Sequence, residues 1–185
     1  AGACEACDLA ASAGTCSPVA DGAAGSPPCS PYLCDGASAS CPAVCAVDWD
    51  CQAGFRCDAG SCVPRKPLGD ACGQGAECLS GSCADGVCCD TACAGACEAC
   101  DLAASVGTCS LVAGGAAGSP SCSPYLCDGA SASCPLVCSG DGDCEAGFWC
   151  ESGECVAKKP LAAICEGASA CQSGFCVDGF CCDTA

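Results

Sequence analysis

The stretch Ala1-Gly2-Ala3-Cys4-Glu5-Ala6-Cys7-Asp8-Leu9-Ala10 decides the fold, because it returns residue for residue at positions 94–103. The offset of 93 residues holds to the C-terminus without a gap, and every cysteine of the second copy has a mate in the first. The period therefore predicts two tandem modules, residues 1–93 and 94–185, with the second ending one residue before the match of Cys93. We attribute the odd cysteine count to this truncation and expect the array to continue in a longer parent chain.

The composition excludes an ordinary hydrophobic core. The chain has 185 residues, of which 31 are Cys, whereas Leu, Ile, Val and Phe together number only 24. A cysteine content above roughly 8–10% marks a disulfide scaffold, and a large-aliphatic content below roughly 20% marks a chain that cannot bury enough apolar surface to fold. We therefore expect a small disulfide-rich fold of low secondary structure, in which covalent bridges take the place of the core.

The net charge of −17 restricts the partners. It argues against nucleic acids, which need clustered Lys and Arg, and against anionic membranes. No apolar run approaches the 18 residues of a membrane span, and the chain has no Asn and hence no N-glycosylation sequon. Serines beside Pro and Ala are candidates for O-glycans, although plain turn residues are the simpler interpretation: Ser26, Ser30, Ser38, Ser40, Ser119, Ser123, Ser131 and Ser133.

Each module contains a shorter internal echo of the form acid-Cys-x-x-Gly, followed by Cys-x-x-Gly-x-Cys. Residues 50–62 and 77–88 both follow it, and the Gly between the last two cysteines is typical of a tight hairpin turn. We interpret each echo as a two-stranded hairpin held by two bridges. Sequence leaves the connectivity open; the pairing we favour is Cys45–Cys57, Cys51–Cys62, Cys72–Cys83, Cys78–Cys88, Cys138–Cys150, Cys144–Cys155, Cys165–Cys176 and Cys171–Cys181.

The adjacent pair Cys88-Cys89 predicts continuity between modules. Neighbouring side chains of an extended chain point to opposite faces, so Cys88 would close its own hairpin while Cys89 reaches forward. We assign the inter-module bridges to Cys89, Cys93, Cys97, Cys100 and Cys182. Because Cys89, Cys93, Cys97 and Cys100 are spaced by four, four and three residues, one short helix over residues 90–105 is also an expectation, weakened by Gly95.

Metal binding and redox chemistry are the alternatives to a bridged scaffold. The chain has no Cys-x-Cys, and its two Cys-x-x-Cys pairs lie 93 residues apart rather than at the 15–20-residue spacing of zinc ribbons. A redox Cys-x-x-Cys needs a βαβ context that is missing. Asp48-x-Asp50 and Asp141-Gly142-Asp143 fit turns better than a calcium loop. Metal–thiolate binding remains a minor alternative, and we predict no cofactor.

Enzymatic chemistry is the function class that the sequence disfavours most. The chain has no His, the usual general base. It has no phosphate-binding glycine loop and no nucleophile elbow. Its carboxylates are scattered through short loops that offer no buried pocket in which a pKa could shift. We predict that the protein is not an enzyme.

One run resembles a known group of proteins. Asp85-Gly86-Val87-Cys88-Cys89-Asp90-Thr91-Ala92-Cys93, continued through Asp101 and by 105–109, looks like the cysteine-rich repeats of large secreted proteins of myxobacteria-like bacteria, and 169–182 fits the same pattern. The segment from Cys16 to Cys41 is shorter and simpler than that pattern. The resemblance implies an exported, cell-surface or matrix location and no defined activity. The Cys-Cys-x3-Cys-x3-Cys spacing is also loosely similar to furin-like cysteine-rich rods, which implies a rod.

Together these features predict a tandem-repeat rod or solenoid with a mechanical role outside the cell, as a filament, stalk or surface coat that self-associates or continues a longer array. The second hypothesis is an adhesion or ligand-binding module that displays its variable loops. The two copies differ most at residues 69–79 and 162–172, around the second hairpin of each module.

Overall fold

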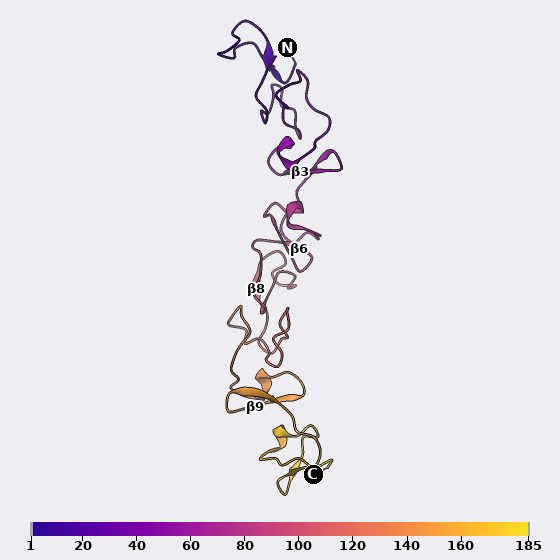
Figure 1. Cartoon of the computed structure of the whole chain (residues 1–185), viewed down its shortest axis with the longest axis vertical. Helices are drawn as coiled ribbons and strands as arrows, with labels where there is room; N and C mark the ends of the chain where they lie inside the picture. Colours follow the sequence, from indigo (N-terminus) through magenta and orange to yellow (C-terminus); the bar gives the residue numbers. More distant parts are fainter. Residues whose placement is uncertain (1, 185) are drawn as a thin grey trace. The chain divides into compact units, whose positions relative to one another are not determined.

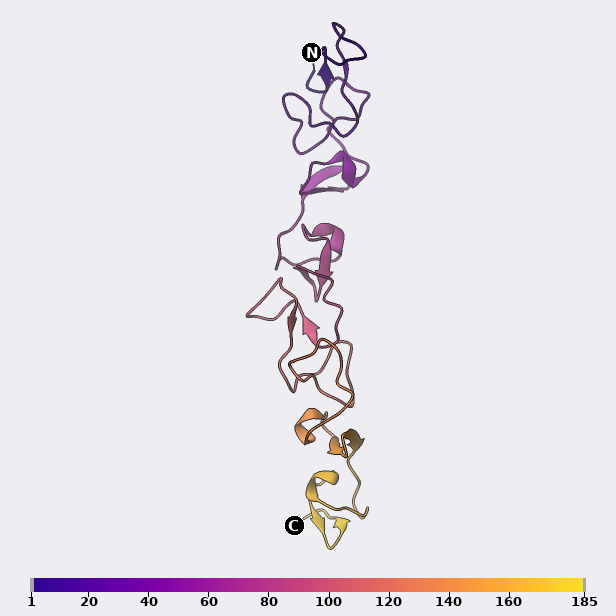
Figure 2. The same cartoon turned by 90° about the vertical axis from the view of Figure 1, so that its left-hand side faces the viewer.

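The computed structural model describes residues 2–184 and shows a chain made of turns, loops and short strand pairs (Figures 1 and 2). It forms two compact units, Ala1–Cys88 and Cys89–Ala185. The sequence repeats are divided after residue 93 instead. The boundary of the compact units therefore lies five residues before the boundary of the sequence repeats.

Every sheet is a single two-stranded hairpin. In the first unit the strands are β1 (Glu5–Ala6) with β2 (Ser17–Pro18), β3 (Phe55–Asp58) with β4 (Ser61–Pro64), and β5 (Ser82–Ala84) with β6 (Val87–Cys89), whose last residue lies past the unit boundary. In the second they are β7 (Glu98–Ala99) with β8 (Ser110–Leu111), β9 (Phe148–Glu151) with β10 (Glu154–Ala157), and β11 (Cys176–Val177) with β12 (Phe180–Cys181).

The hairpins expected from the echo are confirmed, and their turns explain the glycines. In β3–β4, Cys57 lies opposite Cys62 and Asp58 opposite Ser61, which leaves Ala59-Gly60 as a two-residue turn. Both turn residues have positive φ, 47° at Ala59 and 86° at Gly60. This is the type I′ geometry whose twist matches that of the flanking strands, and glycine is the residue that adopts it most easily.

A single 3₁₀ turn directly precedes the first cysteine of each echo, which is Cys51, Cys78, Cys144 or Cys171. These turns are η1 (Asp48–Asp50), η2 (Gly75–Glu77), η3 (Asp141–Asp143) and η4 (Ala168–Ala170). In three of them the last residue is the acid of the acid-Cys motif. Asp50 shows why: its Oδ2 accepts hydrogen bonds from the backbone N–H groups of Ala46 at 2.6 Å and Val47 at 3.0 Å, so the acid fastens the turn.

The short helix expected over residues 90–105 is wrong, and residues 2–184 contain no α-helix. The stretch is instead irregular chain with the short strand β7. Its cysteines do not serve one helical face, because Cys89, Cys93 and Cys97 bond to partners 11, 16 and 30 residues further on. Cys93 itself has a φ of 47°, which a right-handed helix cannot contain.

The buried core of the described residues consists almost entirely of cysteine side chains. Among the described residues, every buried hydrophobic side chain is a cysteine except Ala170, and no polar or charged side chain is buried. The cystines form small separate clusters, each supported by two or three half-buried side chains, such as Tyr32 and Phe55 in the cluster of Cys45, Cys51 and Cys62. Since a bridge that closes a loop of about 15 residues restricts the unfolded chain by roughly 3 kcal/mol, covalent constraint supplies what apolar burial cannot.

Candidate functional site: a cystine framework and two exposed hollows

The disulfide framework contains fifteen bridges and one unbonded cysteine, Cys182. The structure joins the same eight hairpin pairs that the spacing favours: Cys45–Cys57, Cys51–Cys62, Cys72–Cys83, Cys78–Cys88, Cys138–Cys150, Cys144–Cys155, Cys165–Cys176 and Cys171–Cys181. Each hairpin thus carries two interleaved bridges, first cysteine to third and second to fourth. Interleaving ties the 3₁₀ turn and both strands into one unit.

The adjacent Cys88 and Cys89 bond in opposite directions along the chain, as expected for neighbouring side chains on opposite faces of a strand. Cys88 returns to Cys78 in its own hairpin, whereas Cys89 bonds forward to Cys100. This bridge joins the two sequence repeats, although it lies inside the second compact unit. Of the other cysteines assigned to module linkage, Cys93 bonds Cys109, Cys97 bonds Cys127, and Cys182 is unbonded.

The glycine- and proline-rich half of each module has bridges that the sequence did not indicate. Cys4–Cys34 spans 30 residues and Cys29–Cys41 spans 12. Their mates Cys97–Cys127 and Cys122–Cys134 have the same separations. The wide and irregular spacing of these cysteines carries no periodic signal, so the sequence left this pairing open.

The cysteine clusters do not offer thiolate ligands. In the first cluster the sulfurs of Cys4 and Cys29 lie 3.4 Å apart, but Cys4 is bonded to Cys34 and Cys29 to Cys41. Cys4, Cys29 and Cys34 lie close enough together to hold an ion, as do several similar triads. A metal, however, needs deprotonated thiols rather than cystine sulfur.

The paired aspartates serve the backbone. Asp48 Oδ1 accepts a hydrogen bond from the Cys57 N–H at 2.9 Å, and Asp141 Oδ1 does the same for Cys150 at 2.9 Å. Asp143 Oδ2 accepts from Ser139 and Gly140, as Asp50 does from Ala46 and Val47. For Asp50 these bonds hold the pKa of the carboxyl below its ordinary value, because they favour the charged form. The arrangement supports the turn interpretation of both Asp-x-Asp motifs.

The candidate O-glycan serines are all exposed: Ser26, Ser30, Ser38, Ser40, Ser119, Ser123, Ser131 and Ser133. Several also have turn roles. Ser38 Oγ donates to Asp35 Oδ2 at 2.8 Å, and Ser123 Oγ donates to Glu145 Oε2 at 2.7 Å. Ser131 Oγ accepts from the Ser133 N–H at 3.2 Å. Exposure is compatible with modification, and glycosylation of these serines stays a prediction.

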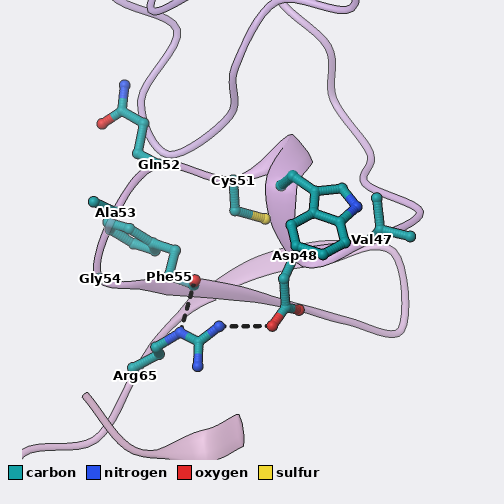
Figure 3. A pocket seen from close by; sticks show the side chains of 9 residues that line it. Val47, Asp48, Cys51, Gln52, Ala53, Gly54, Phe55 and Arg65 are labelled. Atoms are coloured by element: carbon teal, nitrogen blue, oxygen red, sulfur yellow. Dashed lines mark hydrogen bonds and ion pairs between the residues drawn. The ribbon is translucent and has the colours of Figure 1, made fainter. Parts of the chain in front are cut away.

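One hollow lies in the first unit. It has a volume of about 590 Å³ and is lined by Trp49 and Phe55 above an ion pair between Arg65 and Asp48. Arg65 Nη2 lies 2.6 Å from Asp48 Oδ2, and its Nε donates to the Phe55 carbonyl at 3.1 Å (Figure 3). The side chain of Trp49 is 80% exposed. In the second copy Gly142 and Lys158 stand at the positions of Trp49 and Arg65, so the tryptophan is absent there, while Phe148 stands at the position of Phe55.

A second hollow is present in both units. In the first it is lined by Asp35, Pro42, Val44 and Asp50 among others. In the second it is lined by the repeat mates Asp128, Pro135, Val137 and Asp143. The carboxylates around it already accept backbone hydrogen bonds, which lower the pKa values of Asp35, Asp50 and Asp128. The hollow therefore presents both aliphatic side chains and carboxylate oxygens to solvent. Sequence reasoning missed it because its walls come from separate loops.

No protein-family model, curated protein or solved structure matches this chain. The resemblance to cysteine-rich repeats of secreted bacterial proteins therefore stays a prediction. Within residues 2–184, no helix has the length and apolar character that crossing a membrane requires. Bridges at this density are typical of proteins of oxidising compartments, and they suggest an extracellular module stabilised by disulfides.

Proposed function

We propose that the chain is a non-enzymatic structural repeat of an extracellular filament, stalk or surface coat. The observation that carries the proposal is the cystine core, in which every buried hydrophobic side chain but Ala170 is a cysteine. Such a core resists solvent and proteases without the large apolar side chains that a globular domain needs. The forward bridge from Cys89 to Cys100 lets the covalent constraint run from one repeat into the next.

The surface supports the same role. Carboxylates far outnumber basic groups, 22 against 5, so copies of the chain stay soluble at high local concentration. Among residues 2–184 the three ion pairs lie within the first unit and involve partly exposed side chains, such as Lys66 with Glu77 at 2.6 Å. Pairs of this kind contribute little to stability, which leaves the bridges as the source of rigidity.

Two measurements on the oxidised and the fully reduced and alkylated protein test this function. We expect the oxidised chain to resist a broad-specificity protease for hours, and the alkylated chain to be digested within minutes. Negative-stain electron microscopy of the oxidised chain at high concentration should show regular extended assemblies. Equal digestion of both forms, or monodisperse compact particles at every concentration, would contradict a structural role.

The hollow beside Trp49 favours a second candidate function, the binding of a ligand with a flat apolar face. Trp49 is exposed, whereas Trp149, the other tryptophan, packs against the cluster around Cys171. Titration of wild type and Trp49→Ala with sugars and aromatic peptides, followed by tryptophan fluorescence, tests it. Quenching in wild type that disappears in Trp49→Ala, with Trp149→Phe behaving as wild type, supports binding at this site.

A further inference from the structure

The hollow that recurs in both units is built from equivalent residues. Eight residues line it in the first unit, and the repeat mates of all eight line the hollow of the second unit. Six of the eight are identical in the two repeats, and the exceptions are Asp21 and Ala43, whose mates are Gly114 and Leu136. The hollow is therefore a property of the repeated module, unlike the hollow beside Trp49, whose tryptophan the second repeat lacks.

The walls of this hollow are held in the same way in each unit. The Leu33 N–H donates to the Asp50 carbonyl at 2.8 Å, and the repeat mates of both residues make the same bond, also at 2.8 Å. Cys34, which lines the first hollow, is 1% exposed and is bonded to Cys4. Because bridges and hydrogen bonds already fix the walls, a ligand does not have to order the loops in order to bind.

Aliphatic side chains contribute part of the lining. Val44 and its mate Val137 are each 70% exposed, and Leu136 beside Val137 is 83% exposed. Large apolar side chains that gather at a hollow mark a binding surface, because a ligand that covers them gains about 25 cal/mol for each Å² of apolar surface buried.

Carboxylates contribute the rest of the lining, and no basic residue accompanies them. Asp21, Asp35 and Asp50 line the first hollow, Asp128 and Asp143 line the second, and neither lining includes Lys or Arg. Backbone N–H groups bond to Asp50 Oδ2 and Asp128 Oδ1. Within residues 2–184 the other oxygen of each carboxylate accepts no hydrogen bond, so the charge complementary to the hollow is positive.

A lysine or arginine side chain has the chemistry that matches both parts of the lining. Its aliphatic stem packs on apolar surface while its charged end reaches a carboxylate. A metal ion would leave the aliphatic wall uncovered. A neutral apolar ligand would remove carboxylates from water without giving them a partner, which costs free energy.

We propose that the hollow of each repeat binds a basic and aliphatic segment of a partner protein. A Lys or Arg of the segment lies against the carboxylates, and a neighbouring aliphatic side chain covers Val44 or Val137. Binding at these hollows goes beyond the structural role proposed above and does not depend on it, because it needs only the walls of a single module.

A second copy of this chain is not the partner that charge favours. The chain has a net charge of −17 and only five basic residues. Arg56, Arg65 and Lys66 are already in ion pairs within the first unit. Lys158 and Lys159 are half-buried. The partner is therefore a different protein, one that displays basic residues beside aliphatic ones.

Three peptides of equal length test the proposal by titration into the oxidised, ¹⁵N-labelled chain. They are acetyl-Lys-Leu-Lys-Leu-Lys-amide, the purely basic acetyl-Lys-Gly-Lys-Gly-Lys-amide and the neutral acetyl-Gln-Leu-Gln-Leu-Gln-amide. We expect the first to cause saturable shifts of the Val44 and Val137 amides and the other two to bind roughly tenfold more weakly. No saturable shift, equal affinity of the three peptides, or shifts confined to other residues would overturn the proposal.

Variants of the first hollow localise the binding. Val44→Ser should weaken it there roughly tenfold by removing an apolar contact, and Asp21→Asn roughly threefold by removing one exposed charge. The shift of Val137 should persist in both variants and serves as an internal control. Ile164→Ser and Asp8→Asn change an exposed aliphatic and an exposed acidic residue outside the hollows, and binding should not change. Unaltered binding to Val44→Ser, or an equal loss in the control variants, would refute the site.

Two further measurements distinguish a basic segment from other occupants. Millimolar calcium at constant ionic strength should leave the affinity for the first peptide unchanged, and displacement of the peptide would assign the hollow to a metal ion instead. Analytical ultracentrifugation should show the same association state for wild type and Val44→Ser. Self-association of wild type that Val44→Ser weakens would assign the hollow to a second copy and overturn the proposal.

Discussion

At the residue scale, single carboxylates hold loops that contain neither helix nor sheet. Asp35 accepts hydrogen bonds from the Ala37 N–H at 2.9 Å, the Ser38 N–H at 2.7 Å and the Ser38 hydroxyl at 2.8 Å. Asp128 accepts the matching two backbone bonds from Ala130 and Ser131, both at 2.8 Å. An Asp that closes such a turn fixes the backbone of the loop by hydrogen bonds, without any burial of apolar side chains.

These bonds predict a pH dependence. The N–H groups of Ser38 and Ala37, and then the Ser38 hydroxyl, lower the pKa of Asp35 below its ordinary value near 3.8. A depressed folded pKa means that the stabilisation is complete above the unfolded pKa and is lost as the pH falls through the folded value. We expect ¹³C-carboxyl NMR to show Asp35 titrating below pH 3.8, with the Ala37 and Ser38 amide shifts following the same midpoint.

Serine substitutions separate the contributions. Ser38→Ala removes the hydroxyl but keeps the backbone N–H, so the pKa of Asp35 should rise part of the way to its ordinary value. Ser131→Ala is the matched control, because Asp128 is held by backbone groups alone and its pKa should not move. An unchanged Asp35 titration in Ser38→Ala would contradict this account.

At the scale of the element, the hairpin turns depend on glycine for conformational reasons alone. Gly153 has a φ of 92° and no heavy atom within 4 Å of a built Cβ, so a side chain there meets strain rather than a clash. Gly140 likewise has open space around it, but its φ of −166° is extended backbone that any residue adopts. The first repeat has Val47 at the position of Gly140.

Valine substitutions test this difference. We expect Gly153→Val to reduce the local opening free energy of the β9–β10 hairpin by about 1–2 kcal/mol, the cost of a left-handed conformation for a residue with a side chain. Hydrogen exchange of the amide of Val156, which pairs with Trp149 across the hairpin, measures it. Gly140→Val should leave exchange unchanged, and a similar effect of both substitutions would mean that bulk rather than φ decides.

Two positions that contact each other have changed together between the repeats. In the first repeat Lys66 bonds Glu77 at 2.6 Å, and the charge of Arg56 helps Lys66 to lower the pKa of Glu77. In the second repeat Trp149 and Ala170 replace Arg56 and Glu77, and Trp149 packs against the cluster that contains the fully buried Ala170. A charged contact has been exchanged for an apolar one.

A double-mutant cycle tests this exchange. Ala170→Glu should destabilise the η4 and β12 region by about 1–3 kcal/mol, because it places a carboxylate against an indole. Adding Trp149→Arg should recover most of the loss, since it restores the charge pattern of the first repeat beside Lys159. Hydrogen exchange of the Cys181 amide, which donates to the Ala163 carbonyl at 2.8 Å, is the measurement. Additive losses in the double variant would show that the two positions are independent.

At the scale of the whole molecule, the bridges decide whether any structure persists. The fifteen disulfides account for 30 of the 31 cysteines and leave Cys182. Under anaerobic conditions, thiol titration of the denatured, unreduced chain should give about one thiol per chain, that of Cys182. After complete reduction it should give 31. Many titratable thiols in the unreduced chain would contradict the cystine core.

Reduction should also remove the tertiary structure. With 24 large aliphatic and phenylalanine side chains in 185 residues, the alkylated chain cannot offset its conformational entropy by apolar burial. We expect its near-ultraviolet circular dichroism and amide-shift dispersion to collapse to those of an unfolded chain. Retention of the native spectra after alkylation would show that something other than cystine holds the fold.

The sequence by itself determined the period, the replacement of an apolar core by cysteine and the hairpin turns, because the repeat and the composition can be read directly and a Gly between closely spaced cysteines favours a tight turn. It favoured the eight hairpin bridges without excluding other connectivities. Only the tertiary structure decided the pairs Cys4–Cys34 and Cys29–Cys41, the 3₁₀ turns fastened by acids such as Asp50, and the hollow beside Trp49. The two bridges join residues 30 and 12 positions apart along irregular loops, where no period constrains the direction of the chain. The 3₁₀ turns are local, but a single acid before a cysteine does not specify which backbone groups it accepts from. The helix expected over 90–105 failed for the same reason: cysteine spacing reports a helical face only when the cysteines share one partner surface, and here each bonds a different segment.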